Sequence, residues 1–128
     1  MISLACTPSR GYTERLVEIA HTEIAPGQVA ITLTGKLMVG GEGGRIVELV
    51  EALLREDKRI FIFDLSGITV IDSTGVGHFI SSFNKITGAG GEMRMAGATG
   101  HVFQTFHVSL LDQVFRFFPT VAEAAAVG

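Results

Sequence analysis

The chain has 128 residues, 47% of them hydrophobic, with one cysteine and a formal net charge of −3 at pH 7. This length and composition fit one domain with one packed core, and no apolar run reaches the roughly 18 residues of a membrane-spanning helix. The acidic balance, with scattered lysines and arginines, lacks the basic stripe typical of nucleic-acid binding. We therefore expect no membrane insertion and no nucleic-acid partner.

The first third of the chain is predicted to be a hairpin followed by a loop. Leu16–Ala20 and Gln28–Leu33 are β-rich runs, and Ala25-Pro26-Gly27 supplies a turn between them, which predicts an antiparallel pair. Residues 1–13 lack the apolar core of a signal peptide and are interpreted as a loose leader or an extra edge strand. The run Gly40-Gly41-Glu42-Gly43-Gly44 is too rich in glycine for a helix interior.

The middle of the chain changes to a helical period and then to a short apolar run. An amphipathic helix of about three turns is predicted from Arg45. Its apolar positions are Ile46, Leu49, Val50, Leu53 and Leu54. The run Ile60–Phe63 is continuously apolar, which is typical of a strand covered on both faces. We therefore expect a central strand, reached by a right-handed crossover.

The last half alternates helices and strands. A helix is predicted over Thr74–Thr87, a strand over Met93–Ala96, a short helix capped by Thr99, and a strand over Val114–Phe118. Thr120-Val121-Ala122-Glu123 has the spacing of a capping box that opens a final helix. The first of these helices is expected to bury Val76, Phe79, Ile80 and Phe83. The fold class is α/β (α+β), with a central mixed sheet of about five strands and about four helices packed on it.

The segment from Asp64 to Gly77 joins a buried strand to a helix and contains the residues that are candidates for a functional site. The strand is expected to end near Leu65, and Asp72 and Ser73 then fall at the N-terminus of the next helix. One interpretation is that either side chain is only the helix cap, accepting hydrogen bonds from the first turn. The other is that the helix N-terminus, which favours negative charge, accommodates a phosphate on Ser73. The two interpretations are compatible.

The residues around Ser73 resemble a known signature. Ile71-Asp72-Ser73-Thr74-Gly75-Val76-Gly77 resembles that of the STAS domain, and specifically of anti-sigma-factor antagonists. Gly35-Lys36-Leu37, Gly90-Gly91-Glu92-Met93 and Phe106–Leu111 are similar to further segments of this family. The resemblance covers roughly residues 14–127. It implies one STAS-like domain over 14–128, preceded by the leader.

The resemblance also implies a function without catalysis or a cofactor. In the family, an anti-sigma factor that is also a serine kinase binds the unphosphorylated antagonist, releases a sigma factor, and ends the binding by phosphorylating the serine. Ser73 matches that serine. The partner-binding residues are then expected to be Ile71, Asp72, Ser73, Thr74, Gly75, Val76 and His78. Such a protein works in the cytoplasm, which agrees with the single cysteine, Cys6, and a reducing compartment.

Two positions depart from the family pattern. Met38 stands where the family usually has an aspartate, and Leu110 where glycine is common. The missing carboxylate supports an alternative function: an accessory or scaffold subunit of a signalling or lipid-transport complex, without a phosphoswitch. The change at Leu110 is expected to affect a local turn. Whether the chain is a monomer or a homodimer stays open.

Other chemistries are less well supported. The four histidines match no compact metal-ligand motif, so no metal site is expected. The loop 40–44 lacks the Gly-Lys-Ser/Thr ending of a phosphate-binding loop, and Ser73 has no Gly-x-Ser-x-Gly elbow. A nucleotide site and a hydrolase nucleophile are therefore not expected.

Overall fold

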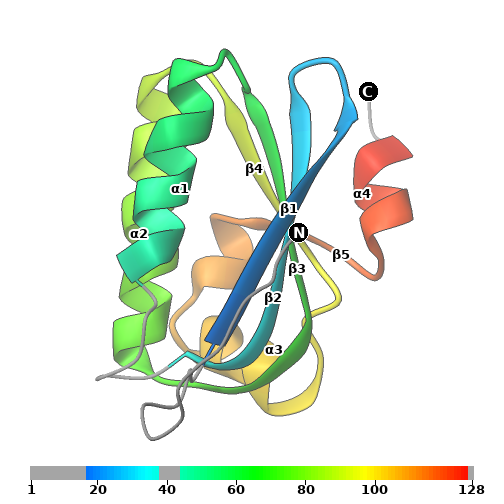
Figure 1. Ribbon diagram of the computed structural model, residues 1–128. Helices are drawn as coiled ribbons and strands as arrows, with labels where there is room; N and C mark the ends of the chain where they lie inside the picture. Colours follow the sequence, from blue (N-terminus) through cyan, green and yellow to red (C-terminus); the bar gives the residue numbers. More distant parts are fainter. Residues whose placement is uncertain (1–16, 38–43, 127–128) are drawn as a thin grey trace, which may run out of the picture.

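The computed structural model describes residues 17–37 and 44–126, which build a five-stranded sheet with helices on both of its faces (Figure 1). The predictions for residues 1–13, Met38 and most of the glycine-rich loop lie outside the described residues. In chain order the elements are β1 (Val17–Ala25), β2 (Gln28–Leu37), α1 (Gly44–Arg55), β3 (Ile60–Ile71), α2 (Ser73–Gly88), β4 (Glu92–Ala96), α3 (Gly100–Val108), the 3₁₀ helix η2 (Leu111–Gln113), β5 (Arg116–Phe118) and α4 (Val121–Ala126).

The sheet is mixed, as predicted, and its strands lie in the order β1-β2-β3-β4-β5. β1 and β2 form the predicted antiparallel hairpin, and the remaining neighbours are parallel. The apolar run that begins at Ile60 is the central strand, which confirms that expectation. Both hairpin strands are longer than predicted, because β1 extends to Ala25 and β2 to Leu37.

The main core lies between the sheet and the helices α1, α2 and α3. Phe63 of β3, Phe79 of α2 and Phe106 of α3 are fully buried there and contact one another edge to face, with ring centroids 5.4 and 5.7 Å apart. α1 and α2 run side by side over this face (Figure 1). Lys85 of α2 and Glu51 of α1 form an ion pair of 2.8 Å, which lowers the pKa of the glutamate.

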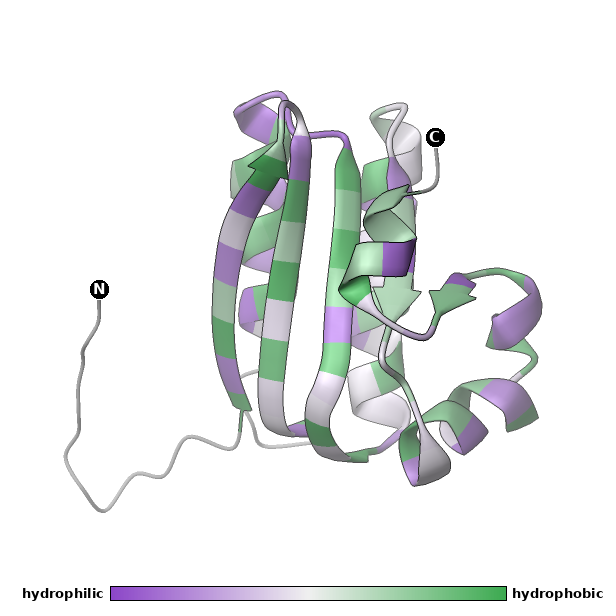
Figure 2. Ribbon diagram, turned by 90° about the vertical axis from the view of Figure 1, so that its right-hand side faces the viewer, coloured by the Kyte–Doolittle hydropathy of each residue, from purple (hydrophilic) through white to green (hydrophobic). Residues whose placement is uncertain are grey.

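The opposite face of the sheet is covered only in part. Ala124 of α4 packs on Ile62 and Ala96, so this short helix covers the central strands. Figure 2 shows α4 in front of one side of the sheet, with β1 and β2 beside it not covered by a described helix. The exposed threonines Thr32 and Thr34 of β2 belong to this open part. No helix among the described residues combines the length and the apolarity that crossing a bilayer requires.

The prediction that the buried strand ends near Leu65 is wrong. β3 continues to Ile71, pairing with β2 beyond an irregularity in register between Thr32 and Thr34. Gly67 lies at this irregularity, where a Cβ atom would come within 3.0 Å of the Leu33 carbonyl oxygen. The polar residues near Gly67 therefore mark a bulge within the strand and not its end.

Two smaller predictions are wrong, and a third is confirmed in part. Ile80 lies at the edge of the buried face of α2 and is 40% exposed. Thr99 is the N-cap residue of α3, as predicted, but its side chain makes no capping hydrogen bond. Val114 is not part of a strand, because the 3₁₀ turn Leu111–Gln113 takes up this segment and β5 begins only at Arg116. Thr120 does cap α4, since its hydroxyl oxygen accepts from the Glu123 amide at 3.1 Å.

Candidate functional site

The candidate site lies where the carboxyl ends of β2 and β3 meet the first turn of α2. Leu37 and Ile71 are neighbours at the ends of these parallel strands. The Asp72 amide, directly after β3, donates to the Leu37 carbonyl at 3.1 Å. Because α2 begins at the next residue, its N-terminus is held against the end of the sheet.

Asp72 is the residue that caps α2. Its backbone is extended, its Oδ1 accepts from the Gly75 amide at 3.1 Å, and its carbonyl accepts from the Val76 amide at 3.0 Å. The cap that the sequence left open between two residues is therefore the aspartate. Ser73 becomes the first residue of the helix, and it is exposed.

Gly75 lets the helix approach the sheet closely. A Cβ atom at this position would lie 2.7 Å from the Leu37 carbonyl oxygen and 2.9 Å from the side chains of Leu37 and Ile71. Contacts this short are too close for any other residue without movement of the backbone. The glycine two residues after Ser73 is thus required by packing, and it helps to position the first turn.

The structure sorts the predicted site residues by exposure. Ile71 and Val76 are 3% and 7% exposed, and Gly75 is also buried, so these three support the site from below. Ser73 and Thr74 are exposed.

Asp72 and His78 are half-buried. His78 faces the start of α1, because a Cβ atom at Gly44 would lie 4.0 Å from its Cε1 atom. Four of the seven predicted residues, Asp72, Ser73, Thr74 and His78, therefore have side chains that reach the surface.

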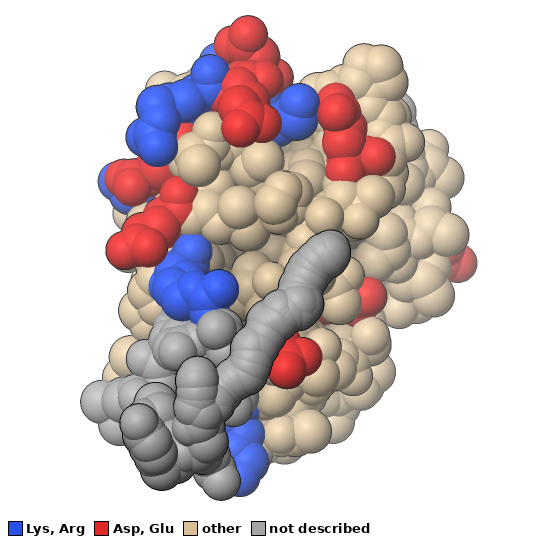
Figure 3. Space-filling model, in the orientation of Figure 1, with Lys and Arg blue, Asp and Glu red and all other residues tan. Residues whose placement is uncertain are grey.

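On the face shown in Figure 3, most of the Lys, Arg, Asp and Glu side chains lie toward the upper left. At the opposite end of the sheet from α2's N-terminus, Lys58 pairs with Glu23 at 3.2 Å and, chiefly through this hydrogen bond, lowers the pKa of that carboxyl. Ser73 itself follows a helix cap and lies among neutral side chains along the sequence, apart from Asp72. Among residues 17–37 and 44–126, no group of three His, Cys, Asp or Glu side chains is placed to hold a metal ion.

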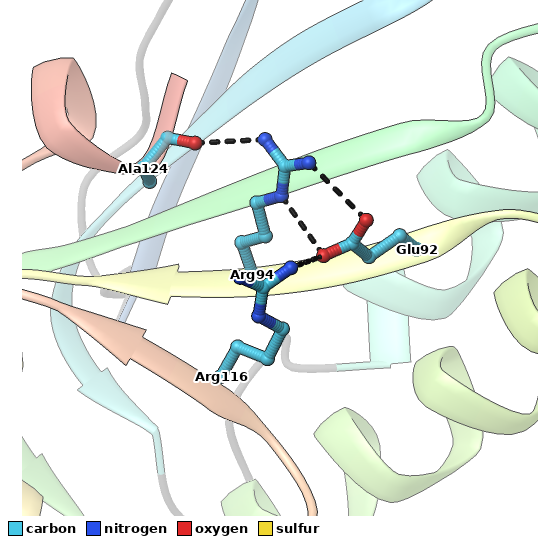
Figure 4. Close-up of polar contacts among 4 residues, drawn as sticks. All are labelled: Glu92, Arg94, Arg116 and Ala124. Atoms are coloured by element: carbon cyan, nitrogen blue, oxygen red, sulfur yellow. Dashed lines mark hydrogen bonds and ion pairs between the residues drawn. The ribbon is translucent and has the colours of Figure 1, made fainter. Parts of the chain in front are cut away.

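Arg94, which no sequence-based prediction named, is the largest fully buried side chain among the described residues. Its guanidinium donates to both carboxylate oxygens of Glu92, at 3.1 and 3.2 Å, and to the Ala124 carbonyl of α4 at 2.7 Å (Figure 4). Arg116 of β5 binds the same carboxylate. The available signal was the opposite charge of residues 92 and 94, which point to the same face of a strand.

The STAS domain family model matches residues 20–124, which is most of the chain. The chain belongs to the STAS domain family. The matched range contains both sides of the candidate site, the end of β2 and the first turn of α2. The predicted resemblance and the predicted fold class are both confirmed.

Solved structures share the fold at low sequence identity. An anti-sigma factor antagonist from Mycobacterium paratuberculosis is similar with a TM-score of 0.73 and 17% identity, over 85% of this chain and 91% of that one. The Bacillus cell fate determinant SpoIIAA in its phosphorylated form has a TM-score of 0.67 and 17% identity, over 84% and 96%. A sulfate transporter family protein from Wolinella succinogenes has a TM-score of 0.68 and 17% identity, over 76% and 80%. At these identities the likeness establishes the fold alone.

Proposed function

We propose that this chain is an anti-sigma-factor antagonist without catalytic activity of its own. In its unphosphorylated form it binds an anti-sigma factor that is also a serine kinase, in the cytoplasm, and so releases a sigma factor. Phosphorylation of Ser73 by that kinase ends the binding. We also propose that residues 14–128 form one domain and that residues 1–13 are a leader or an extra strand.

The observation that carries the proposal is that Asp72 caps α2 while the neighbouring Ser73 is exposed. Asp72 caps α2, so the Ser73 hydroxyl is not needed for the cap and is exposed at the first helical position. A phosphate there adds about −1.5 to −2 charges beside the positive end of the helix dipole. The fold tolerates this charge, while a docked partner surface is repelled. A fold shared with SpoIIAA in its phosphorylated form is consistent with this switch.

The experiment is a titration of the cognate anti-sigma kinase against the wild-type chain, Ser73→Ala and Ser73→Asp, followed by calorimetry. We expect the first two to bind with similar affinity and Ser73→Asp to bind at least about tenfold more weakly, a difference of about 1.4 kcal/mol. Thr22→Asp is the matched control, because it adds the same charge at an exposed residue of β1. Equal affinity for all four proteins would contradict the switch.

A second candidate function rests on Met38, which replaces the aspartate usual in the family. We propose as the alternative that the chain is an accessory or scaffold subunit of a signalling or lipid-transport complex, in which Ser73 only begins a helix. Mass spectrometry of the protein from its native cells separates the two functions. Phosphate on Ser73 under some growth condition supports the antagonist, and its absence under all conditions supports the accessory subunit.

A further inference from the structure

One side of α2 joins Ser73 to an exposed apolar side chain. At 3.6 residues per turn, four residues of this helix lie within about 60° of one another around its axis. Three of them are exposed, and the fourth, a glycine, is half-buried. We call them the α2 strip: Ser73, Gly77, Ile80 and Asn84. The strip runs about three turns along the helix from the proposed phosphorylation site.

The α2 strip lies on a part of the helix that carries no permanent charge. No Asp, Glu, Lys or Arg occurs between residues 73 and 84. The one titratable side chain in this range, His78, is half-buried and faces the start of α1. Lys85 follows the strip, but it forms an ion pair of 2.8 Å with Glu51 of α1. A phosphate on Ser73 would therefore place two negative charges on a neutral strip.

A partner that covers Ser73 also covers Ile80. Seven residues of α-helix separate the two by only about 10 Å along the axis, whereas a standard interface buries about 800 Å² of each protein, a patch about 30 Å across. Ile80 is one of the five large hydrophobic residues that are exposed in the described part of the chain, at 40%. Covering its side chain removes apolar surface from water, which favours binding.

We propose that the anti-sigma factor covers the α2 strip with an uncharged, largely apolar surface anchored on Ile80, and that phosphate on Ser73 ends the binding because it would lose its water there. This proposal rests on the proposed function and adds the chemistry of the partner surface and the physical cause of the switch. An uncharged surface matches a strip that exposes an isoleucine and no charge.

The cost of removing water explains how one phosphate ends the binding. An ion that leaves water without gaining an opposite charge is strongly disfavoured. Asp72 does not act in this way, because its carboxylate is half-buried and accepts from the Gly75 amide within the chain at 3.1 Å. The partner is thus excluded by the hydration of the phosphate and needs no negative charge of its own.

Salt separates loss of hydration from repulsion between like charges. The kinase of the titration above is titrated with Ser73→Asp and with Ser73→Asn, which has nearly the same size and no charge, in about 0.1 M and about 1 M NaCl. The Debye length falls from about 10 Å to about 3 Å over this range, so repulsion is screened whereas hydration is local. We expect Ser73→Asp to bind at least about tenfold more weakly than Ser73→Asn at both concentrations.

Charges of either sign at Asn84 test whether the partner surface is uncharged. We expect Asn84→Asp and Asn84→Lys both to weaken binding, because an uncharged surface favours neither sign. Thr22→Asp and Thr22→Lys are the matched controls at an exposed residue of β1 and should bind like the wild type. Ile80→Ala should weaken binding about tenfold. Ile24→Ala should not, although Ile24 is equally exposed, at 40%.

Several results would overturn this proposal and leave the proposed function standing. One is a defect of Ser73→Asp that 1 M salt removes, which would show a negative charge on the partner. Others are opposite effects of Asn84→Asp and Asn84→Lys, binding of Ile80→Ala equal to the wild type, and binding of Ser73→Asn as weak as that of Ser73→Asp. Equal binding of Ser73→Asp and the wild type would instead contradict the proposed function itself. Urea midpoints equal to that of the wild type show that the variants keep their fold.

Discussion

Gly75 and Gly77 lie in the first turns of α2, one closely packed and the other open to solvent. We expect replacement by alanine to lower the stability of the chain at Gly75 and to raise it at Gly77. A Cβ atom at Gly75 would lie 2.7 Å from the Leu37 carbonyl oxygen, whereas nothing lies within 4 Å of one at Gly77. Gly75→Ala must push α2 away from the sheet, which we expect to cost about 1–3 kcal/mol. Gly77→Ala should stabilise the chain by about 0.5–1 kcal/mol, because alanine is the better helix former.

Urea unfolding of both variants and the wild type measures these changes. The pair is matched, because both substitutions add one methyl group to the same helix two residues apart. A Gly75→Ala variant as stable as the wild type would show that the close approach of α2 to β2 is not required. If Gly77→Ala were less stable than the wild type, the space around residue 77 would not be open, contrary to the structure.

At the scale of elements, α4 depends on contacts with the sheet for its stability. A helix of six residues is too short to be stable alone. Ala124 buries its side chain against Ile62 and Ala96, and its carbonyl accepts a hydrogen bond from the buried Arg94. This guanidinium is itself neutralised by Glu92 (Figure 4). A change at residue 94 should therefore affect β4 and α4 together.

We expect Arg94→Lys to destabilise the chain by about 2–3 kcal/mol, because lysine keeps the buried charge but cannot bind the carboxylate with two parallel hydrogen bonds. Arg116→Lys is the control. It changes a half-exposed arginine bound to the same carboxylate and should cost less than about 1 kcal/mol. Urea unfolding measures both, and amide hydrogen exchange should show lost protection in α4 for Arg94→Lys alone. Equal losses for the two variants would contradict this role of Arg94.

Across the whole molecule, the spacing of apolar residues and the positions of turn residues predicted most of the fold. The antiparallel hairpin, the central strand at Ile60 and the helix that follows Asp72 depend on patterns within a few residues, and each is confirmed. The extension of β3 to Ile71 could not be predicted, because the glycine at position 67 is explained by its close contacts with Leu33 and Thr34 of the neighbouring strand. The hydrogen bond from Arg94 to the Ala124 carbonyl could not be predicted for the same reason, since the two residues are 30 positions apart.

The candidate site was predictable in position but not in detail. A buried strand comes before Asp72 and Ser73 and a helical pattern comes after them, which places both residues at a helix N-terminus from local pattern alone. Which of the two caps the helix depends on a single hydrogen bond to Gly75. The burial of Ile71, Gly75 and Val76 depends on how closely α2 packs on the end of β2, which no local pattern contains.

The free energy of unfolding of the whole chain should decrease as the pH becomes acidic. Hydrogen bonds from Arg94, with a smaller contribution from Arg116, hold the pKa of Glu92 below its ordinary value of 4.5 despite partial burial, which acts in the other direction. A carboxyl whose pKa is lower in the folded state contributes stability that is fully present above its unfolded pKa and is lost as the pH falls through the folded pKa. The ion pairs of Glu23 and Glu51 act with the same sign.

Urea midpoints measured from pH 7 to pH 3 should therefore be nearly flat down to about pH 5 and fall below about pH 4.5. Glu92→Gln should be less stable than the wild type at pH 7, because the buried Arg94 loses its charged partner. The difference between the two proteins should shrink as the pH falls through the folded pKa of Glu92, where the wild type loses the same charge. Glu51→Gln is the control and should change less, because Glu51 and Lys85 are both 42% exposed and solvent screens their pair. A gap between Glu92→Gln and the wild type that stays constant down to pH 3 would mean that the carboxylate charge does not stabilise the β4–β5–α4 contact.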